Sequence, residues 1–474
     1  MKKILQFSTY GIKNIEKMIT IDFANQTIEK GISKINNVKG IFGYNGAGKS
    51  ALITSVDFYN KIVCNPNYLL QNDTKDSLNK VVNYVKNEFF ISVLFEFDKG
   101  IVIKHIIKLI KDDILSDFII SEESISLSIG RTLNDKFKPV IEKREKELYI
   151  GETFKNASSY NYDCSLNDLK YNSIVQFMMQ KIIDRDKEEG QDNEFSVLEK
   201  IIISLYSSVN SILVYMQDSD KHNNYKIDNN LIKELINKVK EINVDLNDSF
   251  DIYTSDAMVS KKEYKKYEAE NKKLERFIKY FKPDLKEIKL IPSENRNVYN
   301  VRKLFVYENY RVEFEFESSG IKQLVKLYSY LEKCASGRIV FIDEIDTNIN
   351  AVYFEKLVSF FKNYGKGQLI FTTHNIEAMK ALKNQSRSIV VLGVDNKLDT
   401  WVGKGNKSPI NDYINGDFPN SPMNIEDFDF INIFIGDEEW LNYYLFWKHA
   451  HLIDQIGCIL NQQLIIFINQ GHLL

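Results

Sequence analysis

The sequence predicts an α/β fold whose central sheet carries a phosphate-binding loop, and three stretches support this prediction. Residues 43–50 read GYNGAGKS and lie between an apolar run at 38–42 and a mostly apolar run at 51–56, as in a strand, a loop and a helix. Residues 337–344 and 368–375 are further apolar runs that end in polar side chains. Because ligands bind at the carboxyl ends of parallel strands, we expect the three stretches to form one site.

The loop matches the pattern G-x-x-x-x-G-K-[ST], in which backbone N–H groups surround a triphosphate. Lys49 would meet the β- and γ-phosphates, and the Ser50 hydroxyl would hold Mg²⁺. A helix that begins near Gly48 would direct the positive end of its dipole at the phosphates. We therefore expect ATP and Mg²⁺ as ligands, with the following residues at the nucleotide: Asn45, Gly46, Ala47, Gly48, Lys49 and Ser50.

Two carboxylates and a histidine follow the other two apolar runs. Asp343 would reach Mg²⁺, directly or through water, and Glu344 would position the water that attacks the γ-phosphate. An acid pair at this point can also cap the next helix, but a phosphate loop upstream favours the catalytic role. His374, as a neutral imidazole, would hydrogen-bond the γ-phosphate or the water. The alternative interpretation is that His374 has only a structural role.

A fourth stretch, residues 316–323, contains Ser318, Ser319 and Gly320 in front of a helical run. Hydroxyl and backbone N–H groups at the start of a helix can bind an anion. The same residues can form a helix N-cap and nothing more, and taken alone they favour that plainer interpretation.

Strand patterns dominate the first part of the chain. Residues 4–9 and 18–23 predict a hairpin that leads into the core sheet. Residues 89–97 and 101–110 predict a second hairpin, and residues 119–129 continue the sheet.

Residues 156–284 are poor in glycine and have apolar residues at helical spacing, which predicts a helical insertion. Within it, residues 260–282 form an amphipathic pattern with many lysines. Such a helix can bind nucleic acid, but a solvated polar face is the stronger interpretation.

The composition is that of a folded protein with no general preference for polyanions. Of the 474 residues, 44% are hydrophobic and 27% are charged, which excludes a disordered chain. The formal net charge is −3, so nucleic-acid binding would need a local basic patch. The four cysteines form no C-x-x-C pair, which argues against a zinc site. With no signal-peptide pattern and no membrane-spanning run, we expect a cytoplasmic protein without a membrane partner.

In this order and spacing, four motifs resemble those of ABC-type ATPases: GYNGAGKS the Walker A motif, ESSGIKQL the signature, IVFIDEID the Walker B motif with the D-loop, and FTTHN the switch histidine. The set is similar to the OLD-like class, whose signature resembles ESSG rather than the transporter LSGGQ. The resemblance implies that Ser318, Ser319 and Gly320 contact the γ-phosphate of ATP bound by a second subunit. It also implies that Asp346 crosses the interface of an ATP-dependent head-to-tail dimer or higher oligomer. Residues 348–350 depart from the Leu-His pair that many relatives have after the D-loop.

The resemblance implies an α/β P-loop NTPase fold of the ABC-ATPase type, with a mixed sheet flanked by helices, an N-terminal antiparallel β lobe and a helical insertion. We expect residues 1–150 to form the N-terminal half of the ATPase head with Walker A, and residues 151–295 a mostly helical insertion. Residues 296–420 would form the C-terminal half with the signature, Walker B and the switch histidine, and residues 421–474 a C-terminal extension.

Residues 413–422 and the length of the chain resemble the ATPase subunits of bacterial phage-defence systems, such as the PARIS and Septu types. Residues 431–439 resemble the opening strand of a Toprim domain, but too few residues follow for a second acidic strand. We therefore expect a sensor ATPase that controls a separate effector, a Toprim-type or HNH nuclease or a toxin, with a phage protein as the trigger. The alternative is a DNA-repair or chromosome-maintenance ATPase that clamps DNA. A transporter subunit is disfavoured because the sequence has no LSGGQ.

Overall fold

The computed structural model describes residues 3–24, 35–98, 100–112, 117–129, 136–143, 148–155, 168–189, 195–216, 229–239, 256–385, 387–403, 407–418 and 420–421. The chain divides into two units, Met1–Ser421 and Pro422–Leu474. The expected C-terminal extension, with the Toprim-like stretch at 431–439, therefore lies outside the described residues, apart from Ser421. None of the described helices is both long enough and apolar enough to span a membrane.

A mixed sheet forms the centre of the first unit, and six described strands build it in the order β17-β16-β3-β15-β14-β9. Five of these strands run parallel, and β17 pairs antiparallel with β16. The strands are β3 (Val38–Gly43), β9 (Ile212–Tyr215), β14 (Ile339–Ile342), β15 (Gln368–Thr372), β16 (Ile389–Leu392) and β17 (Leu398–Thr400). The carboxyl ends of β3, β15 and β14 are thus neighbours at one edge of this sheet.

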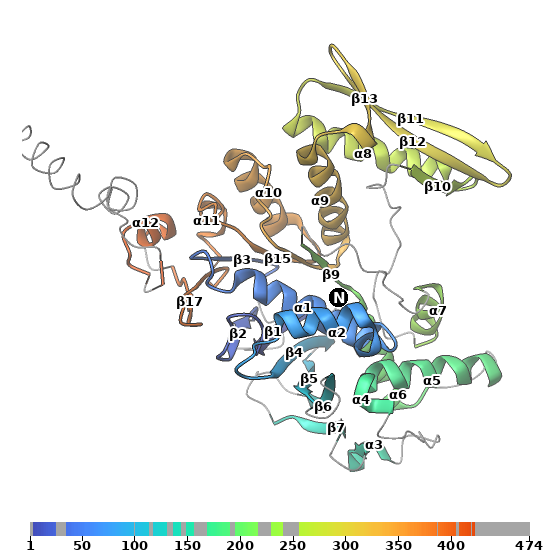
Figure 1. Cartoon of the computed structure of the whole chain (residues 1–474), viewed down its shortest axis with the longest axis vertical. Helices are drawn as coiled ribbons and strands as arrows, with labels where there is room; N and C mark the ends of the chain where they lie inside the picture. Colours follow the sequence, from blue (N-terminus) through green and yellow to red (C-terminus); the bar gives the residue numbers. More distant parts are fainter. Residues whose placement is uncertain are drawn as a thin grey trace, which may run out of the picture. The chain divides into compact units, whose positions relative to one another are not determined.

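Helices cover both faces of the mixed sheet (Figure 1). They are α1 (Lys49–Cys64), α9 (Ser319–Ser336), α10 (Ala351–Tyr364), α11 (Ala378–Leu382) and α12 (Pro409–Ile414). Alternate residues of a strand belong to different cores: Phe341 of β14 packs with α1, whereas its neighbours Val340 and Ile342 pack with α9, α10 and α11. Because both faces are buried, β3, β14 and β15 read as continuous apolar runs, which is why the sequence revealed these three strands.

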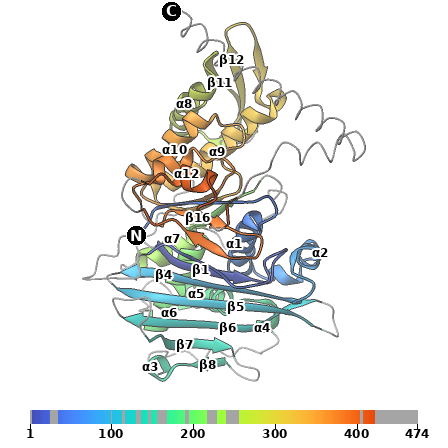
Figure 2. The same cartoon turned by 90° about the vertical axis from the view of Figure 1, so that its left-hand side faces the viewer.

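A separate antiparallel sheet lies beside α1, and seven described strands build it in the order β2-β1-β4-β5-β6-β7-β8 (Figure 2). Its strands are β1 (Lys3–Tyr10), β2 (Ile19–Asp22), β4 (Glu88–Asp98), β5 (Ile101–Lys111), β6 (Phe118–Ile129), β7 (Lys138–Lys143) and β8 (Leu148–Ile150). The predicted N-terminal antiparallel lobe is confirmed, with both hairpins in it. The first hairpin, however, pairs with β4 in this sheet and does not lead into the mixed sheet.

The middle of the chain, predicted to be mostly helical, also contains strands: β9, and β10 (Asp256–Ser260) and β11 (Leu285–Asn295) of the small sheet described below. The helices described between α1 and the signature stretch are η1 (Tyr68–Leu70), α2 (Asn72–Val81), α3 (Glu152–Lys155), α4 (Asp168–Tyr171), α5 (Ile174–Glu189), α6 (Val197–Asn210), α7 (Asn229–Val239) and α8 (Tyr264–Phe281). β9 follows α6 almost directly and pairs parallel with β14. A four-residue apolar run after a helix has no periodicity of its own, so it reads as more helix.

A small sheet precedes the signature stretch. It consists of β10 (Asp256–Ser260), β11 (Leu285–Asn295), β12 (Val298–Tyr307) and β13 (Arg311–Glu313), and η2 (Phe314–Phe316) follows it. The expected boundary between residues 295 and 296 falls in the turn between β11 and β12, where Arg296 has a φ of 49°. These two strands pair along their whole length, so residues 285–307 are one structural element.

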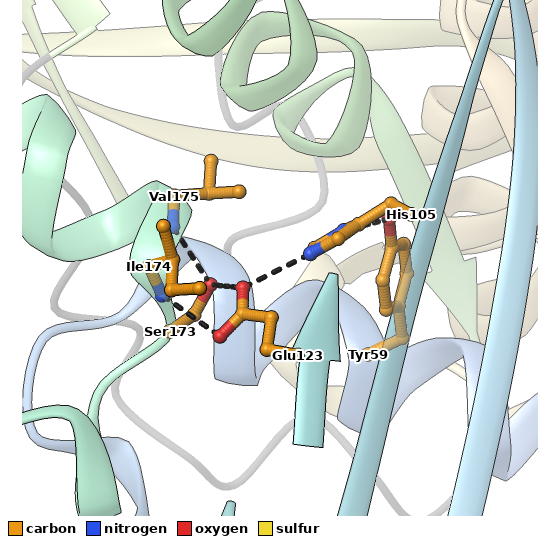
Figure 3. Close-up of polar contacts among 6 residues, drawn as sticks. All are labelled: Tyr59, His105, Glu123, Ser173, Ile174 and Val175. Atoms are coloured by element: carbon orange, nitrogen blue, oxygen red, sulfur yellow. Dashed lines mark hydrogen bonds and ion pairs between the residues drawn. The ribbon is translucent and has the colours of Figure 1, made fainter. Parts of the chain in front are cut away.

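A buried polar network ties α1 to the antiparallel sheet and to α5 (Figure 3). Tyr59 of α1 donates to Nδ1 of His105 in β5 (2.8 Å), and Nε2 of that ring donates to Glu123 of β6 (3.0 Å). The Glu123 carboxylate also accepts bonds from the Ser173 hydroxyl (2.6 Å) and from the backbone N–H of Ile174 (2.8 Å) at the start of α5. These side chains are essentially unexposed, so each bond is made where no water can replace it.

Substituting Glu123→Gln should lower the free energy of unfolding by about 2–3 kcal/mol, measured by urea denaturation. The reason is that the amide N–H₂ of glutamine would face donors that now bond to a carboxylate oxygen of Glu123. Glu122→Gln is the matched control: this exposed neighbour lies 4.0 Å from Lys108, and its change should stay within about 0.5 kcal/mol. Equal effects of the two substitutions would contradict a structural role for the network.

Candidate functional site

The loop between β3 and α1 takes its shape from glycines. Gly43, Gly46 and Gly48 have φ values of 134°, 75° and 106°, which residues with a Cβ rarely adopt. A Cβ on Gly43 would lie 2.2 Å from the carbonyl oxygen of Leu392 in β16, so only glycine fits where the loop leaves the sheet. α1 begins at Lys49, and its free backbone N–H groups therefore face the loop.

A pocket of about 210 Å³ lies against this loop. Most residues predicted for the nucleotide site line it: Asn45, Gly46, Gly48, Lys49, Ser50, Glu344 and His374. Ala47 lies behind the loop with no exposed surface. The remaining wall comes from residues that were not predicted: Lys13, Asn14, Ala51 and Thr372. The structure thus brings the P-loop, the strand-end acid and the histidine together at one pocket.

Lys49 is 6% exposed, and two carbonyl groups hold its ammonium group against the loop. Nζ donates to the carbonyl oxygens of Gly43 (3.0 Å) and Tyr44 (2.7 Å). Burial lowers the pKa of Lys49, and the charges of Asp343 and Glu344 oppose this shift. A cation that is already partly desolvated is well suited to an anionic ligand.

The acid pair follows β14 and is held by hydrogen bonds to its neighbours. The Asp343 backbone N–H donates to the Tyr215 carbonyl (2.9 Å), and its carboxylate accepts from the Thr372 hydroxyl (2.5 Å). Glu344 has a φ of 49°, and its exposed side chain lines the pocket. The acid pair does not cap the next helix, because α10 begins at Ala351 and its N-cap is Asn350. This removes the helix-cap alternative.

Ser50 and Asp343 are oxygen donors of the kind that Mg²⁺ prefers. Ser50 lines the pocket, and Asp343 bonds to Thr372 in its wall. The described residues contain no group of three or more His, Cys, Asp or Glu side chains that could hold a metal by themselves. These two residues therefore fit an Mg²⁺ ion that takes most of its ligands from phosphate and water, as this ion commonly does.

His374 is exposed and follows β15, directly after Thr372 and Thr373. Partial burial lowers its pKa below the ordinary value of 6.5, the charge of Lys49 adds to the shift, and nearby carboxylates oppose it. The imidazole is therefore neutral at pH 7 and offers one donor and one acceptor. Its position in the pocket wall agrees with a hydrogen bond to a phosphate oxygen or to water.

The signature residues Ser318, Ser319 and Gly320 lie at the start of α9 and do not line the described pocket. The Ser318 hydroxyl accepts a bond from the Ile321 backbone N–H (3.3 Å), so Ser318 is the N-cap of this helix. Both serines are exposed. Ser318 thus forms the helix N-cap that the sequence predicted.

The D-loop lies beside the signature. Asn348 has a φ of 65°, and its side chain donates to that of Gln323 in α9. The Asn348 amide also lies 3.4 Å from where a Cβ on Gly320 would be. Asp346, two residues earlier, accepts from the Thr373 hydroxyl (2.6 Å). The segment from Asp346 to Asn348 therefore connects the pocket wall to the start of α9.

Sequence reasoning missed Lys13 and Asn14, which also line the pocket. They follow β1, and the Asn14 side chain donates to the carbonyl of Gly46 in the P-loop. Asn396, in the turn between β16 and β17, fixes this segment by donating to the Asn14 carbonyl (3.0 Å). In the sequence, these residues look like an ordinary turn between two strands, and only the packing of two sheets brings them to the pocket.

Three solved structures are similar to this chain at low sequence identity. An Smc head domain from Pyrococcus furiosus bound to ScpA is 12% identical, with 85% of this chain and 97% of that chain covered and a TM-score of 0.41. The SMC head domain from Thermotoga maritima is 14% identical, with coverage of 82% and 94% and a TM-score of 0.31. The recombination mediator RecF with ATPrS is 10% identical, with coverage of 85% and 98% and a TM-score of 0.36. No curated protein matches the chain.

Residues 40–380 match the family model described as "AAA domain, putative AbiEii toxin, Type IV TA system". This range contains the P-loop, the signature stretch, the acid pair and His374, and it covers most of the chain. The order of the strands and the P-loop after β3 are those of an ABC-type P-loop ATPase fold. The chain therefore belongs to this AAA-domain family.

Proposed function

We propose that the protein hydrolyses ATP at a site that a second copy of the chain completes. The observation that carries the proposal is the pocket in which Lys49, Glu344 and His374 meet. A phosphate loop, an acid and a neutral imidazole around one cavity are the parts that phosphoryl transfer to water requires. Lys49 and the first turn of α1 bind the phosphates, while Ser50 and Asp343 hold Mg²⁺.

The catalytic roles follow from position and charge. Glu344 orients the attacking water, because its side chain is exposed in the pocket while its backbone is fixed. His374 is neutral and hydrogen-bonds the γ-phosphate, since its pKa is below the ordinary value. Mg²⁺ supplies charge neutralisation of the phosphate oxygens.

The second copy supplies the signature. Ser318, Ser319 and Gly320 are outside the pocket of their own chain, yet they offer hydroxyl and backbone N–H groups at a helix N-terminus. A head-to-tail pair related by a two-fold axis would bring each signature to the other chain's ATP, with Asp346 at the interface. Each pair then has two equivalent composite sites.

The nucleotide proposal is tested by Lys49→Ala and Glu344→Gln. Lys49→Ala should weaken ATP binding about tenfold or more, because a charge-assisted phosphate contact is lost. Glu344→Gln should keep ATP affinity but lower turnover by about 10²-fold to 10⁴-fold, because only water positioning is lost. Calorimetry and phosphate release measure the two effects. Normal binding and turnover in Lys49→Ala would refute the assignment of the pocket.

Lys13, whose ammonium group donates to Thr54 of α1 (3.4 Å), should contribute to phosphate binding as a second cation in the pocket lining. Lys13→Met is expected to weaken ATP binding about tenfold while AMP binding changes less, because the ammonium charge acts mainly on the outer phosphates. Lys17→Met, at an exposed lysine close by that does not line the pocket, is the control and should bind as the wild type does. If both variants bind ATP equally well, Lys13 is only part of the turn.

We propose further that ATP-linked assembly controls a separate effector in an anti-phage defence system. The description of the matched family, which names a putative toxin of a type IV toxin–antitoxin system, supports a role in a system of two proteins. The effector would be a Toprim-type or HNH nuclease or a toxin, and the trigger a phage protein. This regulatory role is the biological interpretation of the ATPase proposal above.

The second candidate function is a DNA-maintenance ATPase that clamps DNA directly. Exposed lysines on α8, among them Lys265 and Lys272, favour it. Glu268 and Glu270 lie between these lysines on the same helix, and Glu270 pairs with Lys273 (2.9 Å). The positive electrostatic field at the surface of α8 is therefore weaker than its number of lysines suggests, which is why we rank this function second.

The Glu344→Gln protein, purified with ATP and Mg²⁺, separates the two functions. The sensor proposal expects a stoichiometric protein partner that is absent when Lys49→Ala is added, since ATP is then no longer bound. The DNA proposal expects duplex DNA instead, with affinity that falls steeply with salt and is lost in Lys265→Glu/Lys272→Glu. A trapped protein that carries neither partner nor DNA would contradict both regulatory roles.

A further inference from the structure

Two consecutive threonines at the end of β15 each hold one carboxylate of the neighbouring strand end. The Thr372 hydroxyl donates to Asp343 (2.5 Å), and the Thr373 hydroxyl donates to Asp346 (2.6 Å). Both threonines have no exposed surface. The motif around His374 thus does more than present a histidine, because the residues in front of it reach across to the Walker B and D-loop segment.

Each hydroxyl also accepts a backbone N–H, so that both of its hydrogen-bonding functions are used. The Glu344 N–H donates to Thr372 (2.8 Å), and the Asn375 N–H donates to Thr373 (2.9 Å). A hydroxyl can donate and accept at once, and a methyl group can do neither. Valine has the same shape as threonine, but it would leave both groups without their partner.

Thr372 acts on the pocket of its own chain. Its hydroxyl lies between the Asp343 carboxylate and the Glu344 backbone, and its carbonyl accepts from the Ile345 N–H (3.2 Å). Glu344 has a φ of 49°, a conformation that a residue with a Cβ keeps only when its surroundings impose it. The bonds to Thr372 are therefore what directs the Glu344 side chain into the pocket.

Thr373 acts on the D-loop and not on the pocket. Its hydroxyl holds Asp346, the first residue of the segment that reaches Asn348 and, through it, Gln323 at the start of α9. The same hydroxyl fixes Asn375, directly after His374. Thr373 therefore links the histidine loop to the surface formed by the D-loop and the signature.

We propose that Thr372 and Thr373 are positioning residues with separate tasks: Thr372 orients the acid pair for the ATP of its own chain, and Thr373 orients the D-loop for assembly with a second copy. The proposal rests on the ATPase function and the composite site proposed above. It assigns hydrolysis to the last residue of β15 and assembly to the residue that follows it.

The test compares Thr372→Val and Thr373→Val with the serine substitutions, which keep the hydroxyl groups. Thr372→Val should lower kcat about 100-fold and raise the Mg²⁺ concentration needed for tight ATP binding about tenfold, while ATP still produces the dimer. Thr373→Val should bind ATP and Mg²⁺ as the wild type does, but its ATP-dependent dimer should dissociate about tenfold more readily. Both serine variants should behave like the wild type. Phosphate release gives kcat, titration calorimetry gives the binding of ATP and Mg²⁺, and light scattering after gel filtration gives the dimer.

A double-mutant cycle distinguishes the proposed role of Thr373 from a general loss of folding. If Thr373 acts through Asp346, Thr373→Val in an Asp346→Ala background should add no further loss of dimer, whereas independent effects would add. Equal losses of kcat and dimer in both valine variants, additive effects in the cycle, or serine variants as impaired as valine would each overturn the proposal. A wild-type protein that binds ATP but forms no dimer would refute the composite site instead, and the Mg²⁺ dependence of Thr372→Val would still test its task.

Discussion

The parallel pairing of β3, β15 and β14 is the constraint on which the candidate site depends. The register pairs Ile41 with Thr372 and Phe371 with Ile342, so that the three strands end within a residue or two of one level. The P-loop, the threonine pair and the acid pair follow these ends at the same edge of the sheet. A shift of one residue in any strand would turn its side chains to the opposite face and move the groups of the candidate site apart.

Burial of the sheet on two sides keeps this register. Phe341 packs with α1, whereas Val340 and Ile342 pack with α9, α10 and α11, so neither face tolerates a slip. On the α1 side, the buried bonds from Tyr59 through His105 to Glu123 add direction to an apolar contact, because hydrogen bonds fix geometry that packing alone leaves adjustable. α1 is thereby held relative to the antiparallel sheet.

The sequence could predict those parts of the site that depend on local pattern. An apolar run followed by glycines and lysine, or by two acids, has few structural interpretations, and so the residues around Lys49, Glu344 and His374 were identified in advance. Lys13 and Asn14 could not be, because they reach the pocket only through contacts between separate sheets. β9 escaped notice since four apolar residues carry no period, and Thr372 since an inward-facing threonine in a strand looks like any other buried residue.

The position of the threonine pair gives a physical reason why the acid pair and the D-loop can be oriented by separate side chains. Asp343, Glu344 and Asp346 belong to one short turn, and its backbone N–H and carboxylate groups are divided between Thr372, the last residue of β15, and Thr373, which follows it. Glu344 keeps its unfavourable φ with its backbone bonded to Thr372, whereas Asp346 is bonded to Thr373. A change at the D-loop surface therefore acts first on the bond between Asp346 and Thr373, while a different side chain makes the bonds to Asp343 and Glu344.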